Sequence, residues 1–420
     1  MTRSRRVAVV ARSVAPLHGT GGLERSVLDL VRYLIGHGVH VTLITRPPRG
    51  DADEHGVAAD RDSSLLTTCF VPYRTFPFAG RRGTTVLDRS TAYPLFGRRA
   101  GGLALALARE GRIDLVHGYG ASVLGYATRR RDAQAPLVLN PQGLEEFGAT
   151  APSRARLKRI GYLPLRAAVR RCAAAADRVI ATDGALEPAV RQHLRVPADR
   201  VRVIPNAIDL PAFDRLATTG AAADTRRAAG ILPDERVLLS VGRLEENKGF
   251  HVLASALGGL RHHGAALVAP WRWVIVGDGP YRGRLQRAIQ AAGIADRTLL
   301  AGRASDKDLH AWYAAATLFV HPTLYEGSSL VTLEAMAHRL AVVGTMAGGL
   351  PDKVRPGVNG WLVPPGRSDA LAATLSAALA EPDRLAHMGS AARTIVEEEF
   401  SWEAAGAATL QLYRELLPAW

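Results

Sequence analysis

Short runs of apolar residues alternate along the chain with longer stretches in which apolar residues recur at helical spacing. The run 7–10 (VAVV) is followed by a glycine-rich loop and then by apolar positions three or four residues apart between Leu23 and Ile35. The run predicts a buried strand, and the spacing predicts a helix that the glycines at 36 and 38 would end. Similar runs predict further strands at 39–45, 113–120, 136–143, 177–183, 201–209, 236–242, 272–279, 297–302, 318–322 and 341–345.

Strands and helices that alternate in this way favour an α/β fold with parallel sheets and right-handed crossovers. Because 420 residues are too many for one ordinary core, we expect two Rossmann-like domains that face each other across an inter-domain cleft. The expected N-terminal domain covers residues 1–210, and the expected C-terminal domain covers 234–395. Residues 211–233 are rich in Ala, Thr and Gly and lack apolar periodicity, which predicts a linker.

The excess of basic residues lies entirely in the first half of the chain. The net charge is +14, and residues 1–210 hold 32 Lys and Arg against 18 Asp and Glu, whereas 211–420 hold 21 of each kind. A basic half favours an anionic partner, either nucleic acid, a membrane surface or a substrate. A solvated surface in an arginine-rich sequence is the alternative. Since no nucleic-acid recognition motif is present in the sequence, we do not expect nucleic acid as the partner.

The densest basic stretch, 153–171, carries seven Lys and Arg, no acid and several interleaved apolar residues. It could lie on anionic lipid at the inner face of the cell membrane, or it could be an ordinary amphipathic helix that packs on a sheet. No apolar run is long enough to span a membrane, and the first residues fit a strand better than a secretory signal. Two cysteines, Cys69 and Cys172, exclude a disulfide framework. We therefore expect a cytoplasmic protein, with peripheral membrane attachment left open.

Glycines and cations follow two of the predicted strands at their carboxyl ends. Gly21 and Gly22 lie between a strand and a helix, where the backbone could approach a phosphate, although a plain turn would use the same residues. Arg243 and Lys248 follow the strand 236–242. The guanidinium fork and the ammonium point charge together suit a diphosphate, and solvated loop cations are the alternative.

Two glutamates, Glu326 and Glu334, lie eight positions apart at what the sequence predicts as the start of a helix near Ser328. At a rise of 1.5 Å per residue, their separation is at most about 12 Å, which is close to the distance between a sugar and a ribose joined through a diphosphate. An anion between them would face the backbone amides of Gly327, Ser328, Ser329 and Leu330. The plainer interpretation is a helix cap at Ser328 and an exposed helical residue at Glu334.

In combination, these motifs resemble family 4 retaining glycosyltransferases, whose two facing Rossmann domains form the fold called the B type. The resemblance runs over nearly the whole chain. The segments that carry it are GGLERSVLDLVRYLIGHGVHVTLIT (21–45), DLVHGYG (114–120), VIPNAID (203–209), VGRLEENKGF (241–250), VIVGDGP (274–280), HPTLYEGSSLVTLEAMA (321–337), GTMAGGLPDKV (344–354) and NGWLVPPG (359–366).

The resemblance implies roles on the donor side of a nucleotide-sugar site. Arg243 and Lys248 would bind the donor diphosphate, Glu334 the ribose hydroxyls and Glu326 the transferred sugar. The amides of residues 327–330 would contact sugar and phosphate. Gly21 and Gly22 would approach the diphosphate from the first domain.

The resemblance also implies roles around the donor. His117 would reach the sugar near the reacting carbon, and Arg303 would line the nucleobase pocket. Residues 396–420 would form a helix that crosses back onto the N-terminal domain. On the acceptor side, Gln142 and Glu145 lie in NPQGLEEF (140–147), where many members have His-Gly.

The activity that the resemblance implies is transfer of a sugar, with retention, from a nucleoside-diphosphate sugar to a hydroxyl of a lipid-linked, saccharide or natural-product acceptor. Fixed cations would stabilise the leaving diphosphate, so no metal and no other cofactor is expected. Attack on the face of the departing phosphate is the expected route, with a covalent intermediate at Glu326 as the alternative. A sugar-nucleotide epimerase of the same fold and a non-catalytic basic binding protein are the other functions that the sequence leaves open.

Overall fold

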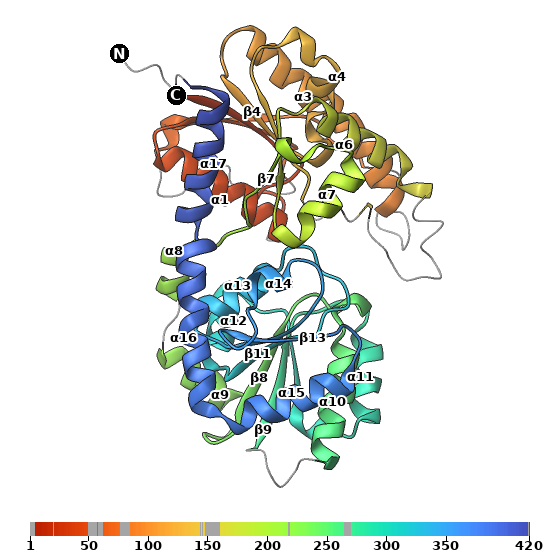
Figure 1. Cartoon of the computed structure of the whole chain (residues 1–420), viewed down its shortest axis with the longest axis vertical. Coiled ribbons are helices and arrows are strands. Elements are labelled where there is room, and N and C mark those ends of the chain that lie inside the picture. The colour runs from red at the N-terminus through yellow and green to blue at the C-terminus, as the bar shows by residue number, and fades with distance from the viewer. Residues whose placement is uncertain are drawn as a thin grey trace. The chain divides into compact units, whose positions relative to one another are not determined.

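The computed structural model describes residues 5–19, 21–48, 57, 62–75, 85–142, 144, 146–147, 160–216, 219–263, 270–418 and 420. The chain divides into two compact units, shown in Figure 1. The first unit comprises residues 1–206 and 405–420, and the second comprises 207–404. The prediction of two Rossmann-like domains with parallel sheets is therefore confirmed.

The first unit contains a seven-stranded parallel sheet in the order β3-β2-β1-β4-β5-β6-β7. Its strands are β1 (Arg6–Val10), β2 (His40–Thr45), β3 (Leu66–Phe70), β4 (Leu115–Tyr119), β5 (Leu137–Asn140), β6 (Arg178–Ala181) and β7 (Val201–Val203). Its helices are α1 (Gly22–Gly36), α3 (Thr85–Arg109), α4 (Leu124–Thr128), α6 (Leu163–Ala175), α7 (Glu187–Leu194) and most of α17 (Trp402–Leu416).

The second unit contains a six-stranded parallel sheet in the order β10-β9-β8-β11-β12-β13. Its strands are β8 (Arg236–Val241), β9 (Trp271–Val276), β10 (Thr298–Gly302), β11 (Leu318–His321), β12 (Val342–Thr345) and β13 (Gly360–Val363). Its helices are α8 (Leu210–Leu216), α9 (Thr219–Ala228), α10 (Phe250–His263), α11 (Arg282–Ala291), α12 (Asp306–Ala315), α13 (Leu330–Ala337), α14 (Leu350–Lys353), α15 (Ser368–Ala380) and α16 (Pro382–Glu399).

The central strands of the second sheet are buried on both faces, which explains why they are nearly continuous apolar runs. Along β8, Leu238 packs into the core under α10 and α15, whereas Val237 and Leu239 pack into the core under α12 and α13. Successive side chains of a strand point to opposite faces, so a strand covered by helices on both sides needs apolar residues at every position.

The segment 211–233, expected to be a linker, is instead part of the second unit. It contains α9 and most of α8, and Phe213 and Ala222 pack against the core on that side of the sheet. A helix whose surface mostly faces water has only a weak apolar stripe, so the apolar periodicity of the sequence does not predict it.

The C-terminal segment 396–420, expected as one crossing helix, is divided between the units at residue 404. Residues 405–420 belong to the first unit, where α17 lies beside α1 (Figure 1). Gly406 packs so closely on Tyr33 of α1 that a Cβ at Gly406 would lie 2.4 Å from the ring. A residue without a side chain at this position therefore lets the two helices approach.

The basic stretch 153–171 contributes to α6, and residues 153–159 lie outside the described part. Leu165, Val169 and Cys172 are buried in the core of the first unit, as the packed-helix interpretation expects. Within α6, the Nε atoms of Arg166 and Arg170 donate to the backbone carbonyls of Glu146 and His193. Contact with an anionic membrane stays a prediction. Among the described residues, no helix is both long and apolar enough to cross a membrane.

Candidate functional site

The carboxyl ends of β8 and β11 lie side by side in the second sheet, and the loops that follow them pack directly on each other. Gly249 has a φ of +68°, and a Cβ there would lie 2.0 Å from the carbonyl oxygen of Pro322. Only glycine satisfies both the left-handed backbone and the close approach. This contact brings Lys248, in the loop after β8, to the loop after β11.

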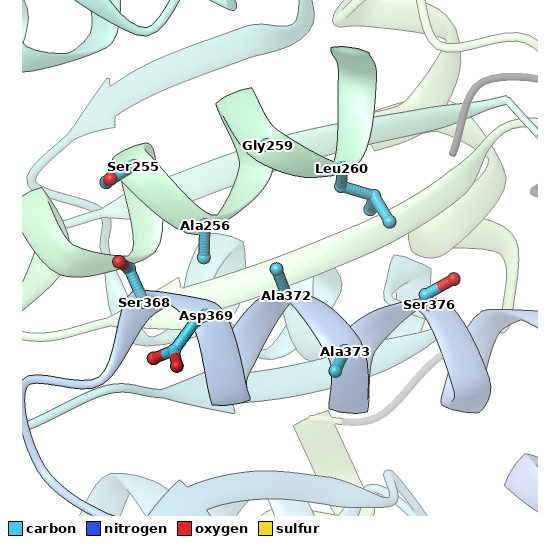
Figure 2. A pocket seen from close by; sticks show the side chains of 9 residues that line it. All are labelled: Ser255, Ala256, Gly259, Leu260, Ser368, Asp369, Ala372, Ala373 and Ser376. Carbon is cyan, nitrogen blue, oxygen red and sulfur yellow. The ribbon is translucent and has the colours of Figure 1, made fainter. Parts of the chain in front are cut away.

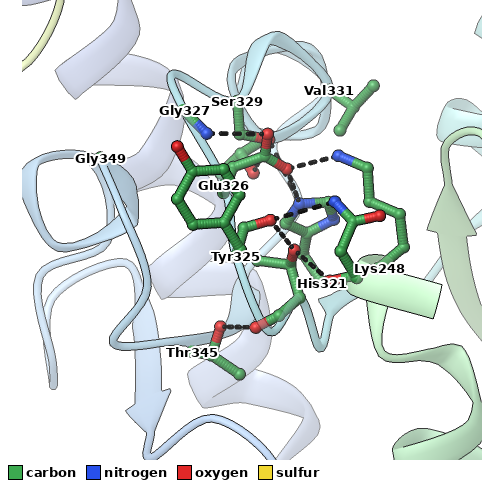
Figure 3. Close-up of polar contacts among 12 residues, drawn as sticks. Lys248, His321, Tyr325, Glu326, Gly327, Ser329, Val331, Thr345 and Gly349 are labelled. Atoms are coloured by element: carbon green, nitrogen blue, oxygen red, sulfur yellow. Dashed lines mark hydrogen bonds and ion pairs between the residues drawn. The ribbon is translucent and has the colours of Figure 1, made fainter. Parts of the chain in front are cut away.

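Lys248, His321 and Glu326 form one hydrogen-bonded cluster (Figure 3). The Nζ of Lys248 lies 2.7 Å from Oε2 of Glu326, and the Nε2 of His321 lies 2.8 Å from the same oxygen. The other carboxylate oxygen, Oε1, accepts the backbone N–H of Gly327 at 3.2 Å. The side chains of Lys248, Glu326 and His321 are 18%, 12% and 0% exposed.

The cluster keeps the carboxyl of Glu326 ionised. Burial alone would raise its pKa, but the hydrogen bond from His321 and the charge of Lys248 outweigh burial, so the net pKa lies well below the usual value. Burial lowers the pKa of His321, and the bond to Glu326 opposes that shift only in part. We therefore assign a neutral imidazole that donates its Nε2 proton to a carboxylate.

The loop from 327 to 329 is held between this cluster and the segment before α14. Gly348 has a φ of +55°, and a Cβ there would lie 1.9 Å from the carbonyl oxygen of Glu326. The N–H of Gly349 donates to the carbonyl of Gly327 at 2.9 Å, and the Nζ of Lys353 donates to Oγ of Ser328 at 3.2 Å. The ammonium of Lys353, although fully buried, thus supports this loop directly.

Helix α13 begins at Leu330, two residues later than expected, with Ser329 as its N-cap residue. The Oγ of Ser329 makes no capping bond and accepts the hydroxyl of Thr332 instead. The amide of Gly327, expected to face a ligand anion, donates to Glu326. Whether the amides of Ser328, Ser329 and Leu330 contact a donor stays a prediction.

Glu334 is buried, which contradicts the plainer interpretation of an exposed helical residue. It lies in the second turn of α13 with 5% of its surface exposed. Its Oε2 accepts the hydroxyl of Tyr313, from α12, at 2.9 Å. A buried carboxylate needs such donors because water is not available to solvate it.

Arg243 and Arg303 do not join the cluster in this structure. The side chain of Arg243 is 68% exposed, and its Nε lies 3.1 Å from Oε1 of Glu245. Arg303 is exposed directly after β10. Both stay predictions as donor ligands, because an exposed side chain can reorient when a ligand binds.

In the first unit, Gly21 and Gly22 lie at the N-terminus of α1, as expected. Gly21 is its N-cap residue with an ordinary φ of −70°, and both glycines are exposed. A Cβ at Gly21 would lie 2.6 Å from Oε2 of Glu24, whose Oε1 accepts the hydroxyl of Ser13. Among the described residues of this loop, Gly19 is the one with a positive φ, of +120°.

His117, expected to reach the sugar, is buried in β4 and bonded to the last helix. It is 1% exposed, and its Nδ1 lies 2.6 Å from the hydroxyl of Tyr413 in α17. Burial lowers the pKa of His117 to about 3, so the ring is neutral at pH 7. Within the described part of the chain, its Nε2 has no hydrogen-bond partner. In this structure, His117 therefore joins β4 to α17.

Of the two acceptor-side residues, Glu145 lies outside the described residues, and Gln142 follows β5. Gln142 has a φ of 60°, unusual for a residue with a side chain. Its backbone N–H and its Nε2 both donate to Oδ1 of Asn140 at 3.1 Å. The side chain of Asn140 thus stabilises the unusual backbone at Gln142.

An alternative site would be another groove in the surface or a cluster of metal-ligating side chains. A surface groove of about 360 Å³ lies between α10 and α15 (Figure 2), and none of the candidate residues lines it. Its lining residues are Ser255, Ala256, Gly259, Leu260, Ser368, Asp369, Ala372, Ala373 and Ser376. In the described ranges, no group of three or more His, Cys, Asp or Glu side chains could hold a metal ion.

Sequence reasoning missed three residues of this region: His321, Tyr313 and Lys353. His321 ends the apolar run LFVH, five positions before Glu326, and that spacing was the available signal. Tyr313 and Lys353 give no such signal, because their contacts depend on how α12 and α14 pack against α13.

Two Rossmann-like units with a cation–carboxylate cluster at the carboxyl edge of the second sheet define a two-domain α/β protein of the B type. The family described as Glycosyltransferase Family 4 matches residues 20–211, and the family described as Glycosyl transferases group 1 matches residues 222–395. The chain belongs to glycosyltransferase family 4.

Three relatives illustrate the similarity. A D-inositol 3-phosphate glycosyltransferase of Xylanimonas cellulosilytica is 29% identical over 99% of this chain and 97% of its own length. An alpha-D-kanosaminyltransferase of Streptomyces kanamyceticus is 31% identical over 60% of this chain and 62% of its own length. The crystal structure of Anabaena Alr3699/HepE in complex with UDP-glucose has a TM-score of 0.70 at 21% identity, over 98% of this chain and 99% of that one. The chain thus covers less than two thirds of the length of some curated relatives. They include the kanosaminyltransferase, of which it covers 62%, and an uncharacterized glycosyltransferase of Methanocaldococcus jannaschii, of which it covers 60%.

Proposed function

We propose that the protein transfers a sugar from a nucleoside-diphosphate sugar to a hydroxyl group of an acceptor, and that the anomeric configuration is retained. The observation that carries the proposal is the ion pair between Lys248 and Glu326. It holds a cation next to a carboxylate that lies in the loop leading into α13. Family membership and the UDP-glucose complex of the Anabaena relative support a nucleotide sugar as the donor.

In the proposed reaction, the bond between the anomeric carbon and the diphosphate oxygen breaks, and its electron pair stays on the diphosphate. Lys248 and Arg243 stabilise the charge that develops there. The acceptor oxygen forms its bond on the same face of the sugar, and its proton passes to the departing phosphate oxygen. Glu326 accepts a hydrogen bond from a hydroxyl of the sugar, and Glu334 accepts hydrogen bonds from the ribose diol.

No divalent metal is required in this proposal, because the side-chain cations of Lys248 and Arg243 carry out the task that a metal would otherwise perform. We expect initial rates to be unchanged by excess chelator. Complete loss of activity on chelation, restored by magnesium or manganese, would contradict the proposal of a metal-independent reaction.

The acceptor is a lipid-linked, saccharide or natural-product hydroxyl compound. The relative from Xylanimonas cellulosilytica is named a D-inositol 3-phosphate glycosyltransferase, so the panel of acceptors to be tested includes a soluble polyol. The basic excess of residues 1–210 favours an acceptor or a surface with negative charge, and an anionic lipid therefore forms a second member.

The test is incubation of the purified protein with a panel of nucleotide sugars and either an aqueous or a lipid extract of cells. Mass spectrometry then identifies the released nucleotide and any new glycoside, and NMR gives the anomeric configuration of the product. A glycoside with the configuration of the donor supports the proposal. A changed nucleotide sugar without any acceptor product would instead show an epimerase, and an inverted product would contradict retention.

A further inference from the structure

The carboxylate of Glu326 presents its two oxygens unequally. Oε2 accepts from both Lys248 and His321, at 2.7 and 2.8 Å, whereas Oε1 accepts, from the described residues, only the N–H of Gly327, at 3.2 Å. A carboxylate oxygen has two lone pairs. Oε2 is therefore fully occupied by the protein, and Oε1 has capacity for one further donor.

The two donors to Oε2 differ in how firmly they are held. Lys248 ends the short turn Glu246–Lys248, and its ammonium is carried on a four-carbon chain. His321 is the last residue of β11, has no exposed side-chain surface and stacks on Phe319 at an interplanar angle of 12°. The imidazole cannot leave its position without disrupting the core, whereas the ammonium can.

The proposed function requires Lys248 to stabilise the diphosphate. When the ammonium turns toward the phosphate, Glu326 loses one of its two donors at Oε2. Of the contacts that the described residues provide to Oε2, the one from His321 then remains. Without it, of these contacts the N–H of Gly327 alone would hold the carboxylate, and that single bond allows a rotation that presents either oxygen to the sugar.

We propose that His321 is a positioning residue, which holds Oε2 of Glu326 in place so that Oε1 accepts a single hydroxyl of the transferred sugar while Lys248 turns to the diphosphate. This inference rests on the proposed function. It also fixes the tautomer of His321, because a carboxylate only accepts hydrogen bonds and the proton must therefore lie on Nε2. Nδ1 then carries no proton, and it has no partner within the described part of the chain.

The test compares His321→Leu, which removes the donor, with His321→Gln, whose side-chain amide can place an N–H near the same oxygen. The exposed His387, on α16, gives the matched control His387→Gln. For each variant, turnover, the dissociation constant of the free nucleoside diphosphate and the melting temperature are measured.

We expect His321→Leu to lower turnover by roughly 10- to 100-fold, which corresponds to the loss of one hydrogen bond to a charged group. The affinity for the free diphosphate should stay close to that of the wild type, since Oε1 contacts the sugar. His321→Gln should recover most of the turnover. Wild-type turnover in His321→Leu would overturn the inference, as would equal loss of turnover in both variants at unchanged melting temperature.

A second measurement does not depend on activity. Long-range ¹H–¹⁵N spectra of the histidine-labelled protein, assigned by comparison with His321→Gln, should show His321 as the neutral tautomer protonated at Nε2. A proton at Nδ1 alone would overturn the inference. If the wild type transferred no sugar from any donor while the spectra showed the expected tautomer, the proposed function would fail and the hydrogen bond from His321 to Glu326 would stand.

Discussion

The two glutamates of the segment 326–334 differ in what surrounds them, although the sequence presents them as a pair. Glu326 is bound by a cation and an imidazole at the carboxyl edge of the second sheet. Glu334 is buried in α13 and accepts the hydroxyl of Tyr313. A carboxylate beside a cation is suited to act where charge develops, and a buried carboxylate with a neutral donor is suited to bind a diol in every state.

We therefore expect the variants of these residues to differ in kind. Glu334→Ala should weaken the affinity for nucleoside diphosphate, because a ribose contact acts equally in the ground and transition states. Glu326→Ala should lower turnover by about 10²- to 10³-fold and leave diphosphate binding nearly intact. Titration calorimetry and steady-state kinetics measure both quantities, with the exposed Glu398→Ala as control. If Glu326→Ala abolished diphosphate binding and Glu334→Ala left it unchanged, the donor would lie in the opposite direction along α13.

Alanine variants of the two proposed phosphate ligands should also lower kcat/KM for the donor to different extents. Lys248→Ala removes a largely buried charge and also one donor to Glu326, so we expect a loss of about 10²- to 10³-fold in kcat/KM for the donor. Arg243→Ala should reduce it less, because an exposed cation is screened by water and salt. Steady-state kinetics with varied donor concentration give these values, and Lys307→Ala on α12 is the matched exposed control. Near-wild-type kinetics in both site variants would contradict the phosphate assignment.

Among the elements, those with a strong apolar pattern could be predicted from the sequence, and those whose pattern depends on packing could not. All eleven predicted strands overlap strands of the two sheets, but β3 and β13 were missed. In β3, four of the five residues are half-buried and two are threonines, whereas β13 begins at a glycine after an asparagine, which resembles a turn. The same limit applies to the site: Glu326 and Lys248 were predicted, but the contact of His321 with Glu326 depends on tertiary packing.

The end of α13 gives a prediction for stability. Arg339 follows the C-cap residue of that helix with a φ of 58°, a conformation that costs a residue with a side chain about 1 kcal/mol more than glycine. Arg339 is exposed, so Arg339→Gly should raise the free energy of unfolding by about that amount. Denaturant titration measures the change. Arg339→Ala removes the same side chain but keeps the Cβ, so an equal gain in that control would show that backbone strain is not the cause.

At the scale of the whole molecule, each unit contains a histidine whose pKa is strongly lowered, His117 being buried and His338 half-buried. His117, in the first unit, has its pKa lowered to about 3 by burial. His338, in the second, has its pKa lowered to about 4 by burial and by the neighbouring His310. An unfolded histidine takes up a proton near pH 6.5. Below that value the unfolded chain binds more protons than the folded one, so each unit should lose stability as the pH falls.

The last prediction tests this separately in each unit by calorimetry between pH 6.5 and pH 4.5. Each of these two histidines changes the free energy of unfolding by at most about 1.4 kcal/mol per pH unit. The melting temperature of both units should therefore fall as the pH is lowered. His117→Gln removes one titrating group from the first unit. Its unfolding should therefore depend less steeply on pH, whatever the change in stability at neutral pH, while the second unit should keep the wild-type slope. His40→Gln, at an exposed position of β2, is the control within the first unit. An unchanged slope in His117→Gln would show that this histidine accepts protons in the folded protein, and a change in both units would show that they unfold together.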